Sequence, residues 1–295
     1  MTVLGTIVVV GDIIDDIIVR PRHAIRQDTD TPAFIERHPG GSSANTAAWL
    51  GHIGADVHFF GQVGAADNDR HTRELERFGV KAHLASDDER PTGTIVIIVE
   101  GEERTMLTDR GANVVFDLNS VPQDLIAVAQ FLHFTGHTII DEPQRDSVIA
   151  LISRAVAHGA TVSIDPATAG FISDFGVAEF LRLCAGAHIL RPNEDEACLL
   201  AGVDDVNEAT RFLTTLFPLV VTTRGRDGVI VGAAGHDLVH VTVEPIDVVD
   251  PTGAGDSFNA GLLAALARGL DPVAAATDAS RVARIGLTSV GARPA

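Results

Sequence analysis

The stretch Asp250-Pro-Thr-Gly-Ala-Gly-Asp-Ser-Phe-Asn-Ala-Gly261 follows a β-like segment, Val241–Val249, and opens a strongly apolar helical pattern. Gly253, Ala254 and Gly255 carry little or no side chain, so a ligand can approach their backbone closely. The free N–H groups at a helix N-terminus point outward, and the helix dipole favours negative charge there. The stretch therefore predicts a strand–turn–helix unit whose backbone amides form an anion-binding site.

Asp256 falls in the first turn of this predicted helix. An acidic residue at such a position commonly does no more than cap the helix. Beside an anion site, however, a carboxylate can take the proton from an alcohol while the amides hold a phosphoryl group in transfer. We interpret Asp256 as the catalytic base of a phosphoryl transfer.

Short apolar, β-branched runs alternate with helical patterns along most of the chain. The predicted strands are Ile7–Val10, Val57–Phe60, Phe131–Phe134, Thr161–Ile164, Ala187–Leu190, Leu219–Thr222 and Val229–Val231. The predicted helices are Ser43–Ile53, Asp67–Phe78, Pro143–His158, Glu194–Ala201, Val206–Leu216, Ala254–Arg268 and Pro272–Thr288. This alternation implies βαβ units and a mainly parallel sheet that helices cover on both faces. We therefore predict a three-layer α/β/α fold.

Two stretches, about 13–38 and 92–108, break the alternation because they read as strands without helices between them. Within the second stretch, Thr94–Val99 and Arg104–Leu107 flank Glu100-Gly-Glu-Glu103 in the pattern of a β-hairpin. We predict that the two stretches pair into a small β-sheet that forms a lid over a cleft. The lid is inserted in a single domain of residues 1–295.

The composition excludes several classes of partner. The 295 residues include 22 Lys and Arg against 40 Asp and Glu, a formal net charge of −18. The chain has no basic cluster, which argues against nucleic acid, and no apolar run approaches the ~18 residues of a membrane span. Cys184 and Cys198 fit no metal or redox spacing. We expect a cytoplasmic protein with neither nucleic-acid nor membrane partners.

Lys81 is the only lysine of the chain, and it lies in no phosphate-binding motif. A Walker A loop, a protein-kinase β3 lysine and a Schiff-base lysine are therefore unsupported. Phosphate handling by this chain must depend on backbone amides, a metal ion and arginine. A Rossmann oxidoreductase would need Gly-x-Gly-x-x-Gly after the first strand, and Gly11-Asp-Ile-Ile-Asp-Asp16 lacks that pattern.

Residues 250–263 resemble the C-terminal signature of the ribokinase-like (PfkB) carbohydrate kinase family, in which Gly-Ala-Gly-Asp precedes a helix. The resemblance implies that Asp256 is the base and that the amides of Gly253, Ala254 and Gly255 form the anion hole. It also implies a ribokinase-like fold with ATP as the phosphate donor and Mg²⁺ at the phosphates.

Two elements nearer the N-terminus extend the resemblance to the substrate side. Gly11 and Asp16 match the family's strand, Gly and Asp five residues on that binds substrate hydroxyls, and Asp12 is a second candidate. The segment Gly40-Gly41-Ser42-Ser43-Ala44-Asn45 resembles the family's Gly-Gly-x-x-x-Asn element. The glycines let the main chain lie against a substrate, and Asn45 offers a donor and an acceptor.

Two further elements resemble the nucleotide side of the family. Asn193-Glu-Asp-Glu196 matches Asn-x-x-Glu, which implies that Asn193 lies towards the phosphates and that Glu196 binds Mg²⁺ through water. Thr222-Thr223-Arg224-Gly225-Arg226-Asp227-Gly228 resembles the Thr-x-Gly-x-x-Gly nucleotide loop. In that loop Thr223 and Gly225 contact phosphate or ribose, Gly228 completes the motif, and Arg224 adds charge near the phosphates.

Two more residues enter as candidates. Arg104 lies on the predicted lid hairpin, where it can close over the γ-phosphate or the substrate. Asp250 and Ser289–Ala292 lie where family members often hold a monovalent cation, which makes K⁺ a candidate cofactor. Homodimers formed through the lid are common among similar proteins, and we expect the same arrangement by analogy.

We conclude from the sequence that the chain transfers a phosphoryl group from ATP to a hydroxyl of a small molecule. A neutral sugar is the first choice of substrate, because the expected pocket offers acidic and amide groups. An adenosine-type nucleoside is the alternative, and a sugar phosphate is third because it needs an arginine such as Arg104 or Arg110. A catalytically weak binding protein is a further alternative, for which degraded catalytic residues would be the mark.

Overall fold

The computed structural model describes residues 5–101, 103–139 and 145–295. In these residues the first strands and helices are β1 (Thr6–Val10), β2 (Ile14–Pro21), β3 (Ala33–Gly40), α1 (Ser42–His52), β4 (Val57–Gly64), α2 (Asn68–Glu76), β5 (Lys81–Asp87), β6 (Gly93–Glu100) and β7 (Glu103–Asp109). The middle of the chain forms α3 (Gln123–Val128), β8 (Ala129–Thr135), α4 (Gly136–Ile139), α5 (Arg145–Ala157), β9 (Thr161–Asp165), α6 (Ala169–Phe175), α7 (Val177–Leu183) and β10 (Ile189–Leu190). The remainder forms α8 (Glu194–Ala201), α9 (Val206–Leu213), β11 (Leu219–Thr223), β12 (Val229–Ala233), β13 (Val239–Val241), α10 (Ala254–Ala267) and α11 (Pro272–Leu287).

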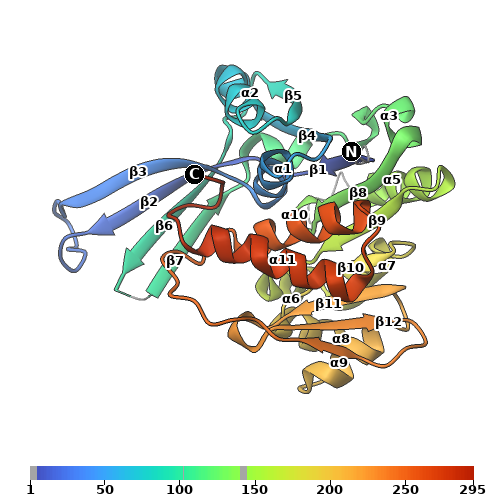
Figure 1. Ribbon diagram of the computed structural model, residues 1–295. Helices are drawn as coiled ribbons and strands as arrows, with labels where there is room; N and C mark the ends of the chain where they lie inside the picture. Colours follow the sequence, from blue (N-terminus) through green and yellow to red (C-terminus); the bar gives the residue numbers. More distant parts are fainter. Residues whose placement is uncertain (1–4, 102, 140–144) are drawn as a thin grey trace.

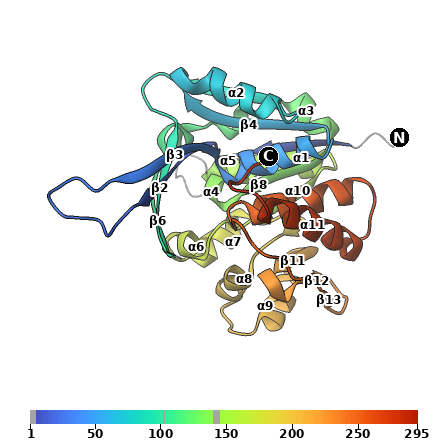
Figure 2. The same cartoon turned by 60° about the vertical axis from the view of Figure 1, so that its left-hand side comes forward.

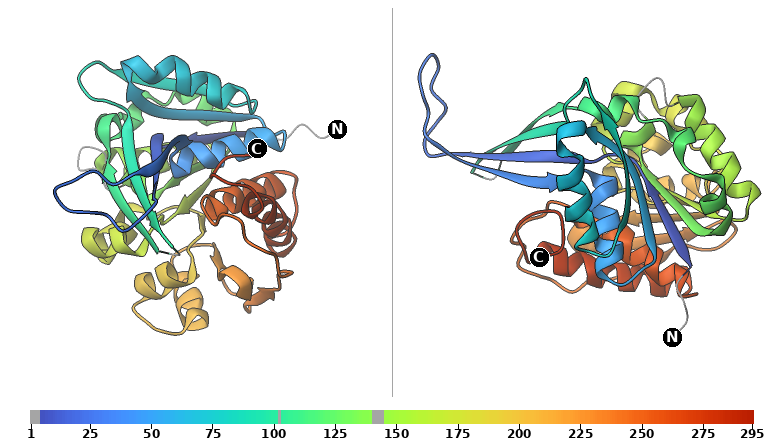
Figure 3. Two further views of the ribbon diagram at one scale, coloured as in Figure 1. Left: turned by 90° about the vertical axis from the view of Figure 1, so that its left-hand side faces the viewer. Right: turned by 90° about the horizontal axis from the view of Figure 1, so that it is seen from above.

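The larger of two sheets has nine strands among the described residues, in the order β13-β12-β11-β10-β9-β8-β1-β4-β5. Its strands pair in parallel from β11 to β5, and only the β11–β12 and β12–β13 pairs are antiparallel. The smaller sheet has the order β3-β2-β6-β7, with β2 and β6 parallel. Figures 1 and 2 show the smaller sheet projecting from one side of the body. In the view from above, the turn between β2 and β3 extends farthest from the body (Figure 3).

Successive side chains of β1 point to opposite faces of the sheet, which shows why two layers of helices form. Ile7 and Val9 pack into a core with α1, α10 and α11, whereas Val8 and Val10 pack into a second core with α5, α7, α8 and α9. All four side chains are fully buried. Because successive residues of a strand point to opposite faces, an unbroken apolar run requires cover on both sides. The predicted three-layer fold and the small separate sheet are confirmed.

Several element predictions were wrong in their bounds or missed. The β-like segment predicted for Val241–Val249 ends at Val241, because Pro245 lacks an N–H group and the Val249 amide donates to Leu287 O at 2.8 Å instead of to a strand. Edge strand β5 was missed because four of its seven residues are polar and only Asp87 is buried. Helices α3, α6 and α7 were also missed. Of the helix predicted from Pro143, residues 143 and 144 lie outside the described part.

Candidate active site

Helix α10 begins at the point the motif predicts, and a glycine is required there. Gly253 is the N-cap residue with φ 75°, in the left-handed region that favours glycine. A Cβ at this position would lie 2.6 Å from the Cα of Ala292. Ala254 already donates its N–H to Pro251 O over a long 3.3 Å. The small residues therefore let two distant chain segments meet at the start of α10.

Asp256 is buried in the first turn of α10, with 7% of its surface exposed. Asn45, in α1, donates from Nδ2 to Asp256 Oδ2 at 2.9 Å. Burial raises the pKa of Asp256 to about 7, while the Asn45 hydrogen bond opposes that rise and the charge of Asp12 adds to it. A carboxylate with a pKa near neutral is suited to take up a proton during a reaction. The geometry and the electrostatics therefore agree with a general base.

Asp16 lies on β2 and is 8% exposed. Burial raises its pKa to about 7; the charge of Arg293 opposes the shift, and the charge of Asp256 contributes to it. Gly40, at the end of β3, passes so close that a Cβ there would lie 2.3 Å from Asp16 Oδ2. Asp16 is therefore a second buried carboxyl group whose pKa is raised towards neutrality.

Asp12, the second candidate for substrate binding, lies against the start of α1. Its carboxylate accepts hydrogen bonds from the Ser42 N–H at 2.9 Å and the Ser43 N–H at 3.0 Å. Burial alone would raise the pKa of Asp12, but His137, Arg110 and the Ser43 amide together lower it. Asp12 is thus an ionised cap on the N-terminus of α1. It anchors the helix that carries Asn45.

Gly41 precedes α1 with φ 92°, and a Cβ there would lie 2.6 Å from the carbonyl oxygen of Asp12. Such a close approach between two chain segments is open only to glycine. Gly40 and Gly41 therefore hold β3 and α1 against β1 and β2. They bring Asn45 and Asp16 to the same place.

The two predicted nucleotide motifs lie side by side. Asn193 and Thr223 form an isolated parallel β-bridge, and the Thr223 N–H donates to Pro192 O at 2.9 Å. Asn193 caps α8 in a reciprocal capping box with Glu196. Glu196 Oε2 accepts from the Asn193 N–H at 2.8 Å, and its Oε1 accepts from Asn193 Nδ2 at 2.9 Å. Burial raises the pKa of Glu196, although Arg191 opposes the rise.

The loop after β11 is built on two glycines with positive φ, Gly225 at 55° and Gly228 at 88°. A Cβ at Gly228 would lie 2.2 Å from Val241 O, so the loop passes tightly over β13. Arg224 Nε donates to Glu194 Oε2 at 3.2 Å, and 23% of the Arg224 side chain is exposed. The structure thus places Arg224 beside the acidic start of α8.

Arg191 is a residue that sequence reasoning missed. It lies just after β10, is 5% exposed and forms an ion pair with Asp165. Its Nε donates to Asn259 Oδ1 at 2.8 Å. A Cβ on Gly255 would lie 3.0 Å from Arg191 NH2, which places this buried cation directly beside the first turn of α10. Its position two residues before Asn193, at a strand end, is the signal that could have indicated it.

Arg104 and Asp250 join the smaller sheet to the loop before α10. Arg104 donates to Asp250 Oδ1 at 3.1 Å and to Thr252 Oγ1 at 2.8 Å. Burial would raise the pKa of Asp250, but hydrogen bonds from Thr252, Gly291 and Arg104 lower it to about 2. Both carboxylate oxygens of Asp250 already accept hydrogen bonds, since Oδ2 accepts from the Gly291 N–H at 3.1 Å.

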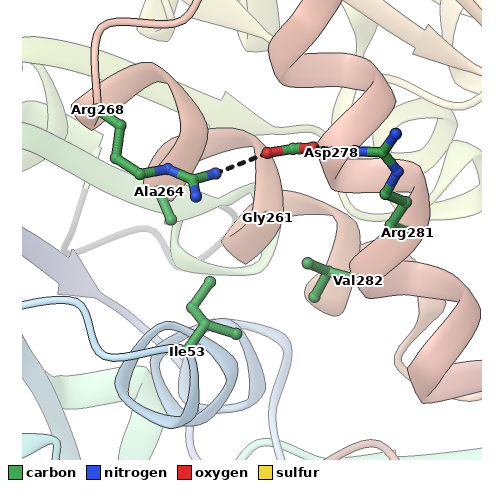
Figure 4. A pocket seen from close by; sticks show the side chains of 7 residues that line it. All are labelled: Ile53, Gly261, Ala264, Arg268, Asp278, Arg281 and Val282. Atoms are coloured by element: carbon green, nitrogen blue, oxygen red, sulfur yellow. Dashed lines mark hydrogen bonds and ion pairs between the residues drawn. The ribbon is translucent and has the colours of Figure 1, made fainter.

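Two cavities lie outside this cluster or at its edge. A cavity of about 270 Å³ lies between α1, α10 and α11, where Asp278 bridges Arg268 and Arg281 (Figure 4). None of the predicted site residues lines it. A cavity of about 10 Å³ beside Gly11 and Asp12 offers room for about one water molecule.

The fold and this cluster of a buried carboxylate, a helix N-terminus and buried arginines are those of a phosphotransferase that acts on small molecules. The profile of the pfkB family of carbohydrate kinases matches residues 5–295. The chain therefore belongs to the pfkB family of carbohydrate kinases. It is 31% identical over 277 residues to a fructokinase of Klebsiella pneumoniae, covering 89% of this chain and 85% of that protein.

Solved structures agree with this assignment. An adenosine kinase from Sinorhizobium meliloti superposes with a TM-score of 0.88 at 26% identity, covering 99% of this chain and 96% of that one. A fructokinase from Vibrio cholerae, in a form with fructose, ADP and potassium ion bound, has a TM-score of 0.82 at 25% identity and covers 98% and 94%. The predicted family, the ribokinase-like fold and the carbohydrate kinase activity are confirmed. In the described part of the chain, no helix is long and apolar enough to cross a membrane.

Proposed function

We propose that the chain transfers the γ-phosphoryl group of ATP to a hydroxyl of a small sugar, with Asp256 as the general base. One observation carries the proposal. The Asp256 carboxylate is buried at the N-terminus of α10, bonded by Asn45, with its pKa raised to about 7. A base there can take the hydroxyl proton as the oxygen attacks phosphorus, while the first amides of α10 hold the transferring group.

The substrate binds on the side of β2 and α1. Asp16 and Asn45 are buried polar groups that can exchange hydrogen bonds with sugar hydroxyls, and Gly40 and Gly41 let the main chain lie close to the ring. The anion hole is formed by Gly253, Ala254 and Gly255. In a chain with one lysine, the adjacent Arg191 supplies a fixed positive charge near that hole.

The nucleotide binds on the side of β11 and α8. Asn193, Thr223 and Gly225 are grouped there, with Gly228 shaping the loop and Arg224 adding charge. The bridge between Asn193 and Thr223 supports this proposal, because it brings the two motifs to one edge of the sheet. Arg191 lies between this edge and the N-terminus of α10, since its NH1 is 3.5 Å from Thr223 Oγ1 and its NH2 is beside Gly255. Phosphates bound at this edge would therefore lie near the anion hole.

Mg²⁺ belongs on the same side, next to Glu196. The donor set fits an ion that keeps its waters, because the described residues contain no group of three or more Asp, Glu, His or Cys able to cage a metal. The two Glu196 oxygens each accept one hydrogen bond from Asn193, which leaves further acceptor capacity for a metal-bound water. When bound, the ion would neutralise charge on the β- and γ-phosphates.

A monovalent cation is proposed near Asp250, with backbone carbonyls as the main ligands. The Vibrio cholerae fructokinase structure holds a potassium ion, which makes K⁺ the candidate. The Asp250 carboxylate is already bonded by Thr252, Gly291 and Arg104, so it would hold the surrounding segments in place rather than act as a free ligand. A comparison of activity in potassium chloride and in choline chloride tests this part of the proposal. Equal rates in the two salts would contradict activation by a monovalent cation.

A neutral sugar is the preferred substrate. The carboxyl groups of Asp16 and Asp256 and the amide of Asn45 are buried on the proposed substrate side. The fructokinase of Klebsiella pneumoniae is among the relatives. The likeness to an adenosine kinase keeps a nucleoside as the second candidate. A sugar phosphate comes third, since Arg104 is bonded to Asp250 and Thr252, and Arg110 donates to His137 O. The intact Asp256 site argues against a binding protein without catalysis.

The experiment is a coupled assay of ADP formation with ATP and Mg²⁺ on ribose, fructose, adenosine and fructose 6-phosphate. We expect turnover to depend on an added sugar, with a phosphorylated product identified by mass spectrometry. Preference for adenosine would replace the sugar by the nucleoside alternative. ADP formation with none of the four above the rate of ATP alone would contradict the proposal in this form.

The exposed surface of the smaller sheet supports a homodimer as the assembled state. Phe34 and Ile35 on β3 are 58% and 67% exposed, and Met106 and Leu107 on β7 are also exposed. Large apolar side chains gathered on one projecting element commonly mark a protein interface. Sedimentation should give a dimer for the parent and a monomer for Phe34→Ser with Ile35→Ser. A parent that sediments as a monomer would contradict this arrangement.

A further inference from the structure

Arg293 lies at the centre of the site, although nothing in its sequence surroundings marks it. The segment before it is held by two long-range hydrogen bonds: Gly291 N–H donates to Asp250, and Trp49 Nε1 donates to Ala292 O at 2.9 Å. Figure 1 shows this end of the chain beside β3 and α1. Arg293 itself is 7% exposed. The tail therefore inserts an arginine between the substrate elements.

Arg293 donates two hydrogen bonds to the Gly-Gly-x-x-x-Asn element. Its Nε donates to Asn45 Oδ1 at 3.2 Å, and its NH2 donates to Gly40 O at 3.1 Å. A guanidinium has only donors, so it can bond the oxygen of the Asn45 amide and never its nitrogen. The amide nitrogen of Asn45 must then face the other way, towards Asp256 Oδ2. Arg293 thereby decides between the two orientations of the Asn45 amide.

We propose that Arg293 is a positioning residue for the phosphoryl transfer: it fixes the Asn45 amide so that Nδ2 donates to the base Asp256. The inference rests on the proposed role of Asp256. An ionised carboxylate only accepts hydrogen bonds, so a flipped Asn45 would present its oxygen to the Asp256 oxygens and repel them. The chain of donors therefore has one direction, from Arg293 through Asn45 to Asp256.

The charges around Asp16 and Asp256 predict how the pH profile of activity would change if Arg293 were lost. The groups that act on Arg293 are Glu74 and Arg70 of α2 and Asp15 and Asp16 of β2. Those that act on Asp256, besides Asn45, are Asp12, Arg191 and the Ser42 side chain. Arg293 lowers the pKa of Asp16, and its partner Asn45 lowers the pKa of Asp256. Loss of Arg293 therefore raises both pKa values and moves the acid limb of the activity profile to higher pH.

The test compares Arg293→Met and Arg293→Lys with a surface control, Arg284→Met. Arg284 lies on α11 and pairs with the exposed Glu244, so its loss should leave the activity unchanged. For Arg293→Met we expect kcat to fall about tenfold to about a hundredfold, the size of a lost charge-assisted hydrogen bond. The acid limb should move to higher pH. Arg293→Lys keeps the charge, so its acid limb should shift less than that of Arg293→Met.

A double substitution separates a positioning role from a purely structural one. If Arg293 acts through Asn45, then Arg293→Met in an Asn45→Ala background should reduce kcat little further. Additive losses, or an Arg293→Met enzyme with the kcat and acid limb of the parent, would overturn the inference. Thermal unfolding of each variant shows whether it folds. If Arg293→Met does not fold, Arg293→Gln replaces it, because the glutamine amide keeps a neutral NH₂ donor group.

The same series tells this inference apart from the proposed function. An Asp256→Asn enzyme with nearly full activity would contradict the proposed role of Asp256 as the base. An inactive Asp256→Asn enzyme together with an unaffected Arg293→Met enzyme would remove only the role of Arg293.

Discussion

The two sheets of the molecule differ in how they are covered and in what they carry. The nine-stranded sheet is enclosed by helices on both faces, and Ile7–Val10 of β1 are fully buried. The four-stranded sheet projects from the body, with Phe34 and Met106 more than half exposed on its outer strands. Where the smaller sheet meets the body, however, Asp15 and Asp16 of β2 are as buried as the core.

This contrast teaches where the chemistry can lie. A carboxylate needs a low-dielectric, fixed setting if its pKa is to rise to about 7, and Asp16 and Asp256 have such a setting where the smaller sheet meets the body. The tip of the smaller sheet is joined to the α10 loop by Arg104, whose side chain is 31% exposed. The junction is therefore suited to catalysis, and the tip to closure or partner contact.

The largest effect should come from Asp256, the proposed base. Asp256→Asn keeps the shape and the hydrogen bond from Asn45 but cannot accept a proton, so kcat should fall by ~10²–10⁴. Steady-state kinetics with a sugar substrate provide the measurement, and circular dichroism checks the fold. Turnover within a few-fold of the parent would contradict the assignment of the base.

The pH profile should follow the same buried carboxyls. Asp256 must be ionised to accept a proton, and its pKa is about 7, so kcat should rise with pH up to about 7 and then level off. Below that limb we expect a loss of about tenfold per pH unit. A flat profile down to about pH 5 would show that neither raised pKa controls the reaction.

The tip should respond more weakly than the junction. Arg104→Met removes both hydrogen bonds to the α10 loop, and we expect KM for substrate or ATP to rise a few-fold, since partly exposed pairs are worth about 1 kcal/mol. Arg20→Met is the matched control, because Arg20 pairs with Glu36 within the smaller sheet and touches no site residue. Equal KM values for the two variants would show that the Arg104 contact does not matter.

The smallest effect should be one of stability, with the opposite sign to the loss of activity. The pKa of Asp256 is raised by folding, so its stabilising contribution is complete below its ordinary pKa of 3.8 and is lost as pH rises to about 7. Asp256→Asn removes that penalty and should be more stable than the parent above pH 7, by about 1–3 kcal/mol. The difference should vanish near pH 4, and denaturant unfolding at both pH values measures it.

Much of the fold could be predicted from the sequence because its signals are local. The apolar β-branched runs and the helical patterns lie in the places where the structure has strands and helices, and the small residues at 253–255 mark the start of α10. Strand β5 was missed because half-exposed edge strands carry polar side chains, which weaken the pattern. The segment 242–249 was wrongly read as β-like because apolar content cannot reveal a missing partner strand.

The site was predicted in its motifs but not in its connections. The sequence motifs predicted Asp256, Asn45, Asn193 and Thr223 as site residues. The structure adds the hydrogen bond between Asn45 and Asp256 and the bridge between Asn193 and Thr223. Asp12 was predicted to contact the substrate, and the structure adds that it caps α1 from 30 residues away. No local signal distinguishes a capping carboxylate from a substrate-binding one at the end of a strand.

The sequence by itself determined the order of strands and helices, the glycine positions and the presence of a carboxylate at the first turn of α10, because each depends on neighbouring residues. Only the tertiary structure decided the setting of that carboxylate. Burial raises its pKa to about 7, Asn45 comes from 211 residues away, and Arg293 lies a further 37 residues along the chain from Asp256. Desolvation and hydrogen-bond direction arise only when distant segments pack together, and they give Asp256 the raised pKa that supports its proposed role as a base.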